Sequence, residues 1–527
     1  MCIKFIINLM KKNNKILKLV MSSTLLIGTS SFVLISCNSK NTIRISLPFT
    51  NNDPRYKTLE KIVHYYNETI VKKTENMLPV SLNSGTTRDR FYYSLSLQLY
   101  GKDYKTPHLA LYYPSLVNLI NEYNRNLDFS SLISNQSIYK NFLRKSPFDS
   151  SGSNFILPLA ISGETLIINK SLLGYLLNQL LVKTNKITIA KEPNYFRDSL
   201  DFFQNLPNQQ KQKIAQSWNL NNLNYDFDNN IVLNNDYFKT YESLFELSSL
   251  ISKITNNLSS PNPKKIFYNH NIANMFYSQL FNDANANFDN YFLKYYKNSS
   301  NLNYQQVFTK SSAEYQSLKK YYDYRMKAIH EKLVFVRPKN PASINFSEQT
   351  LFSIASTRIY EMLNNENNKT SLANNFIYTN SPLKNNSKQS NSSFLTQGLY
   401  LMGIKHSDTE NKQTLKFVEW FYNTNFKDTK LTGAEYFAKQ TNYVFPSNNF
   451  LNSSKKDLNV ANTNLSRLIA QANYDKSLVN FEEPFDSKSD LFRHSIESII
   501  KNIVYSYDQS KTYDFQWFID KLKELNF

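Results

Sequence analysis

The chain has 527 residues and a formal net charge of +19 at pH 7, with 9 glycines, 2 cysteines and 6 histidines. This length is enough for two or three domains with sizeable cores. The sequence contains no Gly-x-Gly and no Gly-x-Ser-x-Gly motif. It therefore lacks the local signatures of dinucleotide-binding enzymes and of α/β-hydrolases. Two cysteines exclude a disulfide framework, and the scattered histidines lack the spacing of a metal site. We therefore expect no enzyme, no cofactor and no metal site.

The first 36 residues have the pattern of a secretory signal. Lysines at positions 11, 12, 15 and 18 precede an apolar stretch over residues 19–35, which ends in Leu34-Ile35-Ser36-Cys37. This ending resembles the lipobox of bacterial diacylglyceryl lipoproteins, which implies cleavage before Cys37, acylation of its thiol and a short tether over residues 37–41. Two or three acyl chains anchor a protein stably in a bilayer. We expect lipidation at Cys37 and anchoring on the extracellular face of the cell membrane; a transmembrane anchor is the alternative.

The positive charge has two explanations. It suits anionic lipid headgroups or an anionic ligand. AT-rich codon usage is the alternative, because Lys, Asn, Tyr, Phe and Ile are all abundant. We expect no nucleic-acid partner.

Hydrophobic periodicity after the tether predicts short strands that alternate with helices. Residues 42–48 alternate apolar and polar side chains, and Asp53-Pro54 supplies a helix N-cap followed by a first-turn proline. The expected continuation is a helix to residue 70, strands at 78–82 and 107–112, and helices at 86–99 and 115–127. This alternation favours a parallel sheet with helices on both faces.

The middle of the chain is richer in polar residues. Residues 129–148 are expected to run over the surface, and two apolar strand-like runs, 155–161 and 164–170, meet at a Ser162-Gly163-Glu164 break. Residues 364–371 and 380–393 have the composition of polar loops. Further helices are expected at 196–206, 209–218, 237–255, 273–281, 311–333 and 412–422.

Five stretches carry a resemblance to a known family. They are residues 42–50; residues 107–113, where His108 replaces the family's usual aspartate; residues 157–170; residues 346–357; and residues 396–404 with the helix 412–422. Their order resembles the extracellular solute-binding proteins of ABC importers, in particular the group that binds sugars and glycerol phosphates. Residues 432–440 and 443–446 resemble the C-terminal region of a Mycoplasma and Ureaplasma surface lipoprotein family. The resemblance implies an α/β, two-lobed, periplasmic-binding-protein-like (type II) fold with helix-rich insertions, in a mollicute surface lipoprotein.

The resemblance also implies a domain order and a function. The expected order is an N-terminal lobe (42–160), a distal lobe with insertions (161–393), a return to the first lobe (394–426) and a C-terminal segment that packs on the distal lobe (427–527). The implied function is the substrate receptor of an ABC importer, with a small polar solute, a membrane permease and, through acylated Cys37, the lipid bilayer as partners. The alternative is an adhesin or surface antigen on the same fold that meets host surface molecules. A surface hydrolase or nuclease is disfavoured because no paired carboxylate, histidine or metal constellation is present.

Candidate ligand residues follow from the expected topology. In a doubly wound sheet, ligands bind beyond the carboxyl ends of strands and between domains. This rule selects Thr50, Asn51, Ser84, Gly85, Thr86, Tyr112, Tyr113, Ser162, Glu164, Ser356, Thr357 and Arg358. Arg358 suits a carboxylate or phosphate, and the two tyrosines suit a sugar ring.

Each candidate also has a purely structural interpretation. Residues 84–86 fit an ordinary turn and helix cap, the two tyrosines fit a core, and Arg358 fits an exposed helix start. The one dense acidic cluster consists of Glu482, Glu483 and Asp486, and Pro484 interrupts any helix there. We expect this cluster to be solvated, with acid–base chemistry or cation binding as the alternative.

Overall fold

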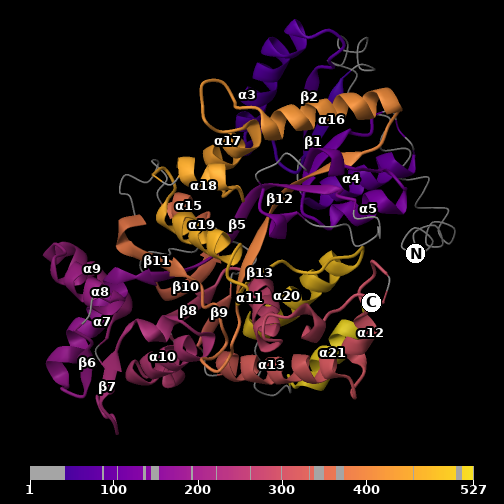
Figure 1. The fold of residues 1–527 in the computed structure, drawn as a ribbon. Coiled ribbons are helices and arrows are strands. Elements are labelled where there is room, and N and C mark those ends of the chain that lie inside the picture. Colours follow the sequence, from indigo (N-terminus) through magenta and orange to yellow (C-terminus); the bar gives the residue numbers. More distant parts are fainter. Residues whose placement is uncertain are drawn as a thin grey trace, which may run out of the picture. The chain divides into compact units, whose positions relative to one another are not determined.

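The computed structural model describes residues 42–85, 88–101, 103, 105–133, 138–143, 153–191, 194–220, 222–260, 263–297, 299–330, 333–336, 349–363, 373–454, 456–505, 513–525 and 527. Apart from Thr42, these residues belong to one compact unit, Ile43–Phe527 (Figure 1). The expected signal and tether with Cys37, the candidate Thr86 and the loop 364–371 lie outside the described residues. No helix in the described part of the chain is long and apolar enough to cross a membrane.

A mixed β-sheet forms the frame of this unit. Eleven strands of the described residues belong to it, and its main order is β2-β1-β3-β12-β5-β10-β8-β9. The expected parallel pairing is found between β1 and its neighbours β2 and β3, whereas β12 runs antiparallel to β3 and β5. The strands are β1 (Ile43–Leu47), β2 (Val80–Ser84), β3 (Leu109–Tyr112), β4 (Asn126–Leu127), β5 (Ile156–Asn169), β8 (Lys265–Asn269), β9 (Val334–Val336), β10 (Thr350–Ser356), β11 (Phe376–Asn380), β12 (Ser392–Ile404) and β13 (Leu478–Phe481), with β6 (Ile187–Ile189) and β7 (Ile231–Leu233) as a separate pair.

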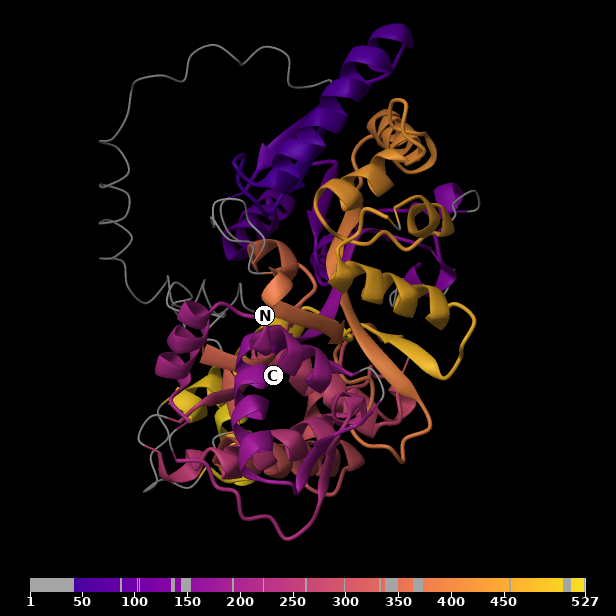
Figure 2. The same cartoon turned by 90° about the vertical axis from the view of Figure 1, so that its left-hand side faces the viewer.

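Two large hydrophobic cores lie along the two long strands β5 and β12. On β5, Leu157 and Leu159 belong to one core and Leu166 and Ile168 to the other. We call the elements around the core that contains Leu157 the first lobe, and those around the core that contains Leu166 the second lobe. Figures 1 and 2 show β5 and β12 passing from one group of elements to the other.

In the first lobe, helices pack against the strands β1, β2 and β3. Asp53 caps α3 by accepting a hydrogen bond from the backbone N–H of Arg55 at 2.8 Å, and the buried face of α3 includes Leu59, Ile62 and Tyr66. Helix α16 begins with a capping box between Ser407 and Glu410. The helices of this lobe are α3 (Pro54–Thr69), α4 (Arg88–Tyr100), α5 (Leu116–Glu122), α6 (Ser130–Ile133), α16 (Asp408–Asn423), α17 (Gly433–Gln440), α18 (Asn448–Ser454) and α19 (Val460–Ala472).

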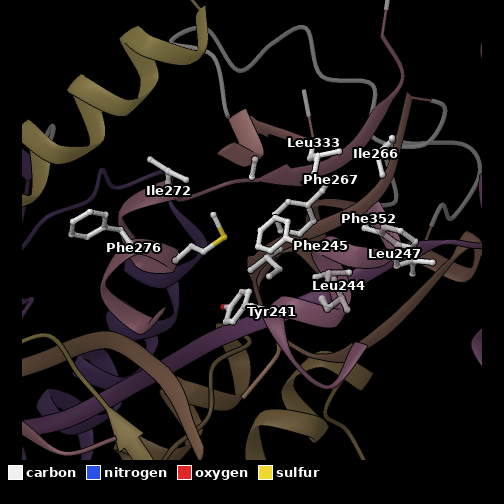
Figure 3. Close-up of a cluster of buried hydrophobic side chains, with 14 of the residues drawn as sticks. Tyr241, Leu244, Phe245, Leu247, Ile266, Phe267, Ile272, Phe276, Leu333 and Phe352 are labelled. Carbon is white, nitrogen blue, oxygen red and sulfur yellow. The ribbon is translucent and has the colours of Figure 1, made fainter. Parts of the chain in front are cut away.

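The second lobe is rich in helices and aromatic side chains. Figure 3 shows part of its core, where Tyr241, Leu244 and Phe245 of α10 meet Phe267 of β8 and Phe276 of α11. Burying a side chain of this size stabilises the fold by about 1.5–3 kcal/mol. Its helices are α7 (Lys170–Lys183), α8 (Tyr195–Gln204), α9 (Asn208–Trp218), α10 (Tyr241–Ile254), α11 (Ile272–Asp283), α12 (Tyr304–Phe308), α13 (Ala313–His330), α20 (Ser489–Tyr505) and α21 (Phe515–Lys523), and α15 (Ile359–Leu363) packs in a smaller separate cluster.

Strand β5, the crossover strand that runs from the first lobe to the second, differs from its prediction. Residues 155–170 were expected as two strands with a break at Gly163, but β5 is continuous through it. A Cβ at Gly163 would lie 2.7 Å from Cδ1 of Leu465 and 3.1 Å from the carbonyl oxygen of Leu395. The glycine therefore permits close packing of α19 and β12 against β5 and does not form a turn.

The expected surface course of residues 129–148 is corrected by burial. Residues 129–148 were expected to run over the surface, yet Phe129, Ile138 and Phe142 belong to the first core. The polar residues between these side chains hide the apolar pattern in the sequence.

The C-terminal segment 427–527 was expected on the distal lobe. Its part from Leu431 to Leu478 contributes side chains to the first core, and its part from Phe492 to Leu522 contributes to the second. The segment is therefore divided between the lobes.

Candidate ligand-binding cleft

A cavity of about 180 Å³ is lined by residues of both lobes. The lining residues come from the loop after β3, from the N-cap of α11, from β12, from the segment after β13 and from α20. They are Tyr113, Pro114, Ser115, Asn271, Leu395, Thr396, Gln397, Gly398, Tyr400, Glu482, Glu483, Pro484, Phe485, Ser489, Asp490, Arg493, His494 and Glu497. Pockets at the boundary of two lobes are frequent ligand sites, so this cavity is the candidate cleft.

The first lobe contributes the carboxyl end of β3. Tyr113 follows this strand directly, and Ser115 stands at the N-cap position of α5. The Ser115 hydroxyl does not cap that helix; its Oγ donates to Oδ2 of Asp490 on α20, at 3.2 Å. A polar contact thus joins the two lobes beside the cavity.

The second lobe contributes a guanidinium group in a network of acceptors. Arg493 on α20 forms an ion pair with Glu483 and donates to Oδ1 of Asn271 at 3.1 Å and to Oδ1 of Asn274. Burial disfavours its charge, but the attraction and hydrogen bond of Glu483 outweigh burial and raise the pKa of Arg493 above its ordinary value. Arg493 therefore stays charged and fixed in place.

Glu164 extends this network to the crossover strand. It is buried on β5, and burial raises its pKa to about 7, although a hydrogen bond with Asn274 and the charge of Arg493 oppose the shift. The carboxyl group therefore changes its charge near neutral pH.

The acidic cluster is not solvated as expected. Asp486 is 5% exposed and accepts hydrogen bonds from the backbone N–H of Leu302 at 2.9 Å and from the Tyr304 hydroxyl at 2.8 Å. Glu482 accepts from the Tyr400 hydroxyl, and both Glu482 and Glu483 line the cavity. The partners that bury these carboxylates, Tyr400 for Glu482 and Leu302 and Tyr304 for Asp486, are more than 80 residues distant along the chain. Local sequence patterns therefore did not reveal them.

The predicted ligand residues that follow the first three strands do not come together at one site. Tyr113 lines the cavity, while Tyr112 is buried in the first core and stacks on Phe91 with 5.1 Å between ring centroids. Thr50 and Asn51 are exposed and do not line this cavity. Ser84 and Gly85 line a separate cavity within the first lobe, next to Arg44 and Arg90.

Two predicted residues of the crossover lie close to the cavity lining. Ser162 donates to the carbonyl oxygen of Gln397 at 3.2 Å, and Gln397 lines the cavity. Glu164 contacts the Arg493 network through Asn274. Sequence reasoning missed Asp490 and Arg493; their i,i+3 spacing on α20 places both on one helix face, which is the one local signal that could have found them.

The remaining predicted residues, Ser356, Thr357 and Arg358, contact Gly163 and Tyr443 at a different place in the fold. The backbone N–H of Thr357 donates to the carbonyl of Gly163 at 3.0 Å, and that of Arg358 donates to Oγ of Ser356 at 3.4 Å. The guanidinium carbon of Arg358 lies 4.9 Å from the ring centroid of Tyr443. These residues do not line the cavity between the lobes.

Two histidines that are distant in sequence meet at the far end of β3. The ligand atoms of His108, His406 and Glu410 lie within 4.8 Å of one another, and the two rings stack at 4.1 Å. Nδ1 of His108 accepts from the Arg44 backbone N–H at 3.1 Å, and Nε2 of His406 faces the Pro107 carbonyl at 3.1 Å. The His108 proton therefore lies on Nε2, toward Glu410, and parallel rings do not direct lone pairs to one point. Burial, helped by His406 and Arg44, lowers the pKa of His108 to about 4.

Comparison with known sequences identifies related lipoproteins. Residues 395–505 match the family described as mycoplasma lipoprotein, C-terminal region. An uncharacterized lipoprotein of Mycoplasma pneumoniae is 31% identical over 132 residues, which cover 23% of this chain and 90% of that protein. An uncharacterized protein of the same organism is 34% identical over 181 residues, 31% of this chain and 36% of that protein, so the chain spans about a third of its length.

Comparison with solved structures identifies the fold. The cyclic alpha-maltosyl-1,6-maltose binding protein of Arthrobacter globiformis superimposes with a TM-score of 0.55 at 10% identity, over 92% of this chain and 97% of that one. UgpB of Mycobacterium tuberculosis, in complex with glycerophosphocholine, gives 0.54 at 13% identity with the same coverage. The predicted α/β two-lobed fold of extracellular solute-binding proteins is thereby confirmed.

Proposed function

Because the chain belongs to the family of mycoplasma lipoproteins, we propose that it is a membrane-anchored extracellular solute-binding lipoprotein. In this proposal it is the substrate receptor of an ABC importer and carries out no chemistry on its cargo. The cargo is a small polar solute, with sugars and glycerol phosphates as the expected classes. Acylated Cys37 holds the receptor on the extracellular face of the membrane, near the permease. The observation that carries the proposal is the cavity lined by both lobes.

The proposed mechanism is hinge closure. Strands β5 and β12 pass between the lobes, and we place the hinges near residues 158–161 and Phe394, with the lobes bounded near residues 160 and 393. The expected hinge near Phe426 is not part of this proposal, because Phe426 and side chains from Leu431 to Leu478 contribute to the first core. A ligand shifts such an equilibrium only if it binds the closed state better than the open one. Tyr113 in the first lobe and Asp490 in the second are positioned to contact one solute together.

The fold comparisons support a binding role. The Arthrobacter globiformis neighbour is named for a maltose-derived sugar, and the Mycobacterium tuberculosis neighbour holds glycerophosphocholine. Their low identity leaves the cargo of this chain to be identified by experiment.

The test is a thermal-unfolding screen of the full-length protein in detergent. The panel contains sugars, glycerol phosphates, nucleosides, amino acids, peptides and organic amines. A ligand at one hundred times its dissociation constant adds about 2.7 kcal/mol to the free energy of unfolding. We expect saturable stabilisation by one class, abolished by Tyr113→Ala in the first lobe and by Asp490→Asn in the second.

Tyr474→Ala is the matched control, because Tyr474 is 78% exposed and does not line the cavity. It should leave the response unchanged. A folded protein that responds to no member of the panel would contradict the receptor proposal and favour the adhesin or antigen alternative.

A further inference from the structure

Helix α4 of the first lobe carries apolar side chains on two opposite faces. One face packs into the first core and consists of Phe91, Leu95 and Leu99. The opposite face, which we call the outer stripe of α4, consists of Tyr93, Leu97 and Tyr100. These three side chains are 63%, 53% and 65% exposed, and their i, i+4, i+7 spacing places them in one row. A surface helix normally has polar side chains opposite its core face, so this row indicates a contact surface.

The chemistry of the outer stripe suits the boundary between lipid and water. No side-chain hydrogen bond or ring contact joins the stripe to the rest of the described chain. Leu97 is fully apolar, whereas Tyr93 and Tyr100 each combine an apolar ring with a hydroxyl at its tip. Such side chains gather at membrane interfaces, because the ring leaves water while the hydroxyl stays hydrated.

The last turn of α4 lies beside the beginning of the fold. The Thr106 hydroxyl donates to the carbonyl oxygen of Gln98 on α4 at 3.3 Å. The Arg44 guanidinium donates to the carbonyl oxygen of Thr106 at 3.1 Å, and Arg44 is the second residue of β1. Phe91 stacks on Tyr112 of β3, so α4 packs on the sheet where β3 pairs with β1 (Figure 1).

The proposed lipid anchor limits how far β1 can be from the membrane. Ile43, where β1 begins, is the sixth residue after Cys37. Six residues of fully extended chain span at most about 22 Å. A helix with its side chains is about 10–12 Å in diameter, so the outer face of a helix that packs directly on the sheet lies within this span. The first lobe is therefore able to place the outer stripe on the bilayer while the acyl chains stay inserted.

Charge attraction is not the basis of this contact. The segments at the same edge of the sheet carry exposed charges of both signs. Lys73 and Glu75 precede β2, and Lys405 and Asp408 follow β12, whose end pairs with the start of β3. Apolar side chains gain from burial in a neutral bilayer as well as in an anionic one.

We infer that the outer stripe of α4 rests in the interface of the bilayer that holds the lipid anchor, with Tyr93, Leu97 and Tyr100 among the lipid headgroups. The partner is the lipid surface itself. The inference rests on the proposed acylation of Cys37 and goes beyond the proposed solute binding, because it assigns the surface that holds the first lobe against the membrane. Two attachments to one surface support each other, since each raises the effective concentration of the other.

The test is the fluorescence of a labelled, full-length lipoprotein in phosphatidylcholine vesicles. An environment-sensitive nitrobenzoxadiazole group is attached at Ser96→Cys, a position on α4 that leaves the stripe intact. Cleavage before Cys37 removes Cys2 and acylation blocks the Cys37 thiol, so the original chain should take up no label. We expect a blue-shifted emission that is quenched by phosphatidylcholine brominated near the headgroup end of its acyl chains. The quenching should be the same at low and high ionic strength.

A second label position controls for the anchor alone. Tyr474→Cys places the label at a side chain that is 78% exposed, shortly before β13. Strand β13 pairs with the beginning of β12, and the other end of this 13-residue strand lies beside β3, about 40 Å away. The label at position 474 should show neither the blue shift nor the quenching.

Variants of the stripe separate lipid contact from folding. Tyr93→Ser combined with Leu97→Ser should reduce the quenching at Ser96→Cys at least twofold, whereas Tyr93→Trp should preserve it. Both changes are at exposed positions, so the melting temperature in detergent should stay the same. Flotation with the vesicles should also persist, because the acyl chains are unchanged.

The possible outcomes are distinct. Equal, weak quenching at positions 96 and 474 in protein that floats with the vesicles overturns the inference and leaves the anchor and receptor proposals standing. An emission shift that grows with the protein-to-lipid ratio and is not quenched by brominated lipid also overturns it, because a second copy then covers the stripe. Protein that does not float overturns the anchor proposal and this inference with it, while the thermal screen still decides solute binding.

Discussion

Oγ of Ser115 in the first lobe donates a hydrogen bond to Oδ2 of Asp490 in the second lobe, over 3.2 Å. The two residues are 375 positions apart in the chain, and both line the cavity between the lobes. This bond stabilises the approach of α5 to α20. In a receptor that closes on its ligand, it belongs to the contacts that set the balance between open and closed states.

Ser115→Ala should shift that balance toward the open state. A hydrogen bond to a charged acceptor contributes about 1.5–3 kcal/mol when buried and less when solvent reaches it. We expect a larger radius of gyration by small-angle X-ray scattering, with a nearly unchanged melting temperature. Ser453→Ala, at an exposed serine of α18, is the control. An unchanged radius in Ser115→Ala would show that the bond does not hold the lobes together.

Glu164 should make stability depend on pH. Its pKa is about 7 in the fold, against an ordinary value of 4.5. Between these values the folded protein binds more protons than the unfolded one, so the free energy of unfolding falls as pH rises. The loss is complete above pH 7 and amounts to about 3 kcal/mol, since one pKa unit corresponds to about 1.4 kcal/mol.

Glu164→Gln removes this penalty and keeps an oxygen acceptor for Asn274. We expect the variant to be more stable than the original chain at pH 8 and equally stable at pH 4, in urea unfolding followed by circular dichroism. Glu419→Gln, at an exposed position of α16, should show no such difference between the two pH values. Equal gains at both pH values would mean that Glu164 is not the titrating group.

Cys37→Ser should release the protein from the membrane. Loss of the thiol prevents attachment of the diacylglyceryl group and hence the burial of its acyl chains, each methylene of which contributes about 0.8 kcal/mol. We expect the protein to lose incorporated radiolabelled palmitate and to leave the detergent phase in a Triton X-114 partition. Cys2→Ser is the control and should remain lipidated, since it changes the other cysteine of the chain. A variant at position 37 that still enters the detergent phase would favour the transmembrane anchor.

Local sequence patterns predicted those parts of the molecule that depend on near neighbours. The alternation in β1 and the Asp53 cap of α3 are set within a few residues, and both are found. The family resemblance, rather than periodicity, supplied the two-lobed arrangement. Contacts between distant segments were missed: the Arg493 network joins α11 and α20 across about 220 residues, and His108 meets His406. Such pairs depend on how the chain folds back, which spacing along the sequence does not encode.

Gly163 gives a direct test of packing at the crossover. An added Cβ would come within 2.7 Å of Cδ1 of Leu465 and 3.1 Å of the carbonyl oxygen of Leu395. Overpacking of this kind costs about 1–3 kcal/mol, so Gly163→Ala should lower the free energy of unfolding by that amount. Leu465→Ala removes the nearer atom but leaves a cavity of its own in the first core. The double variant should therefore be more stable than the sum of the two losses predicts, and a double-mutant cycle in urea measures this coupling. Strict additivity would show that Leu465 is not what confines position 163, and would leave the backbone of β12 as the limiting contact.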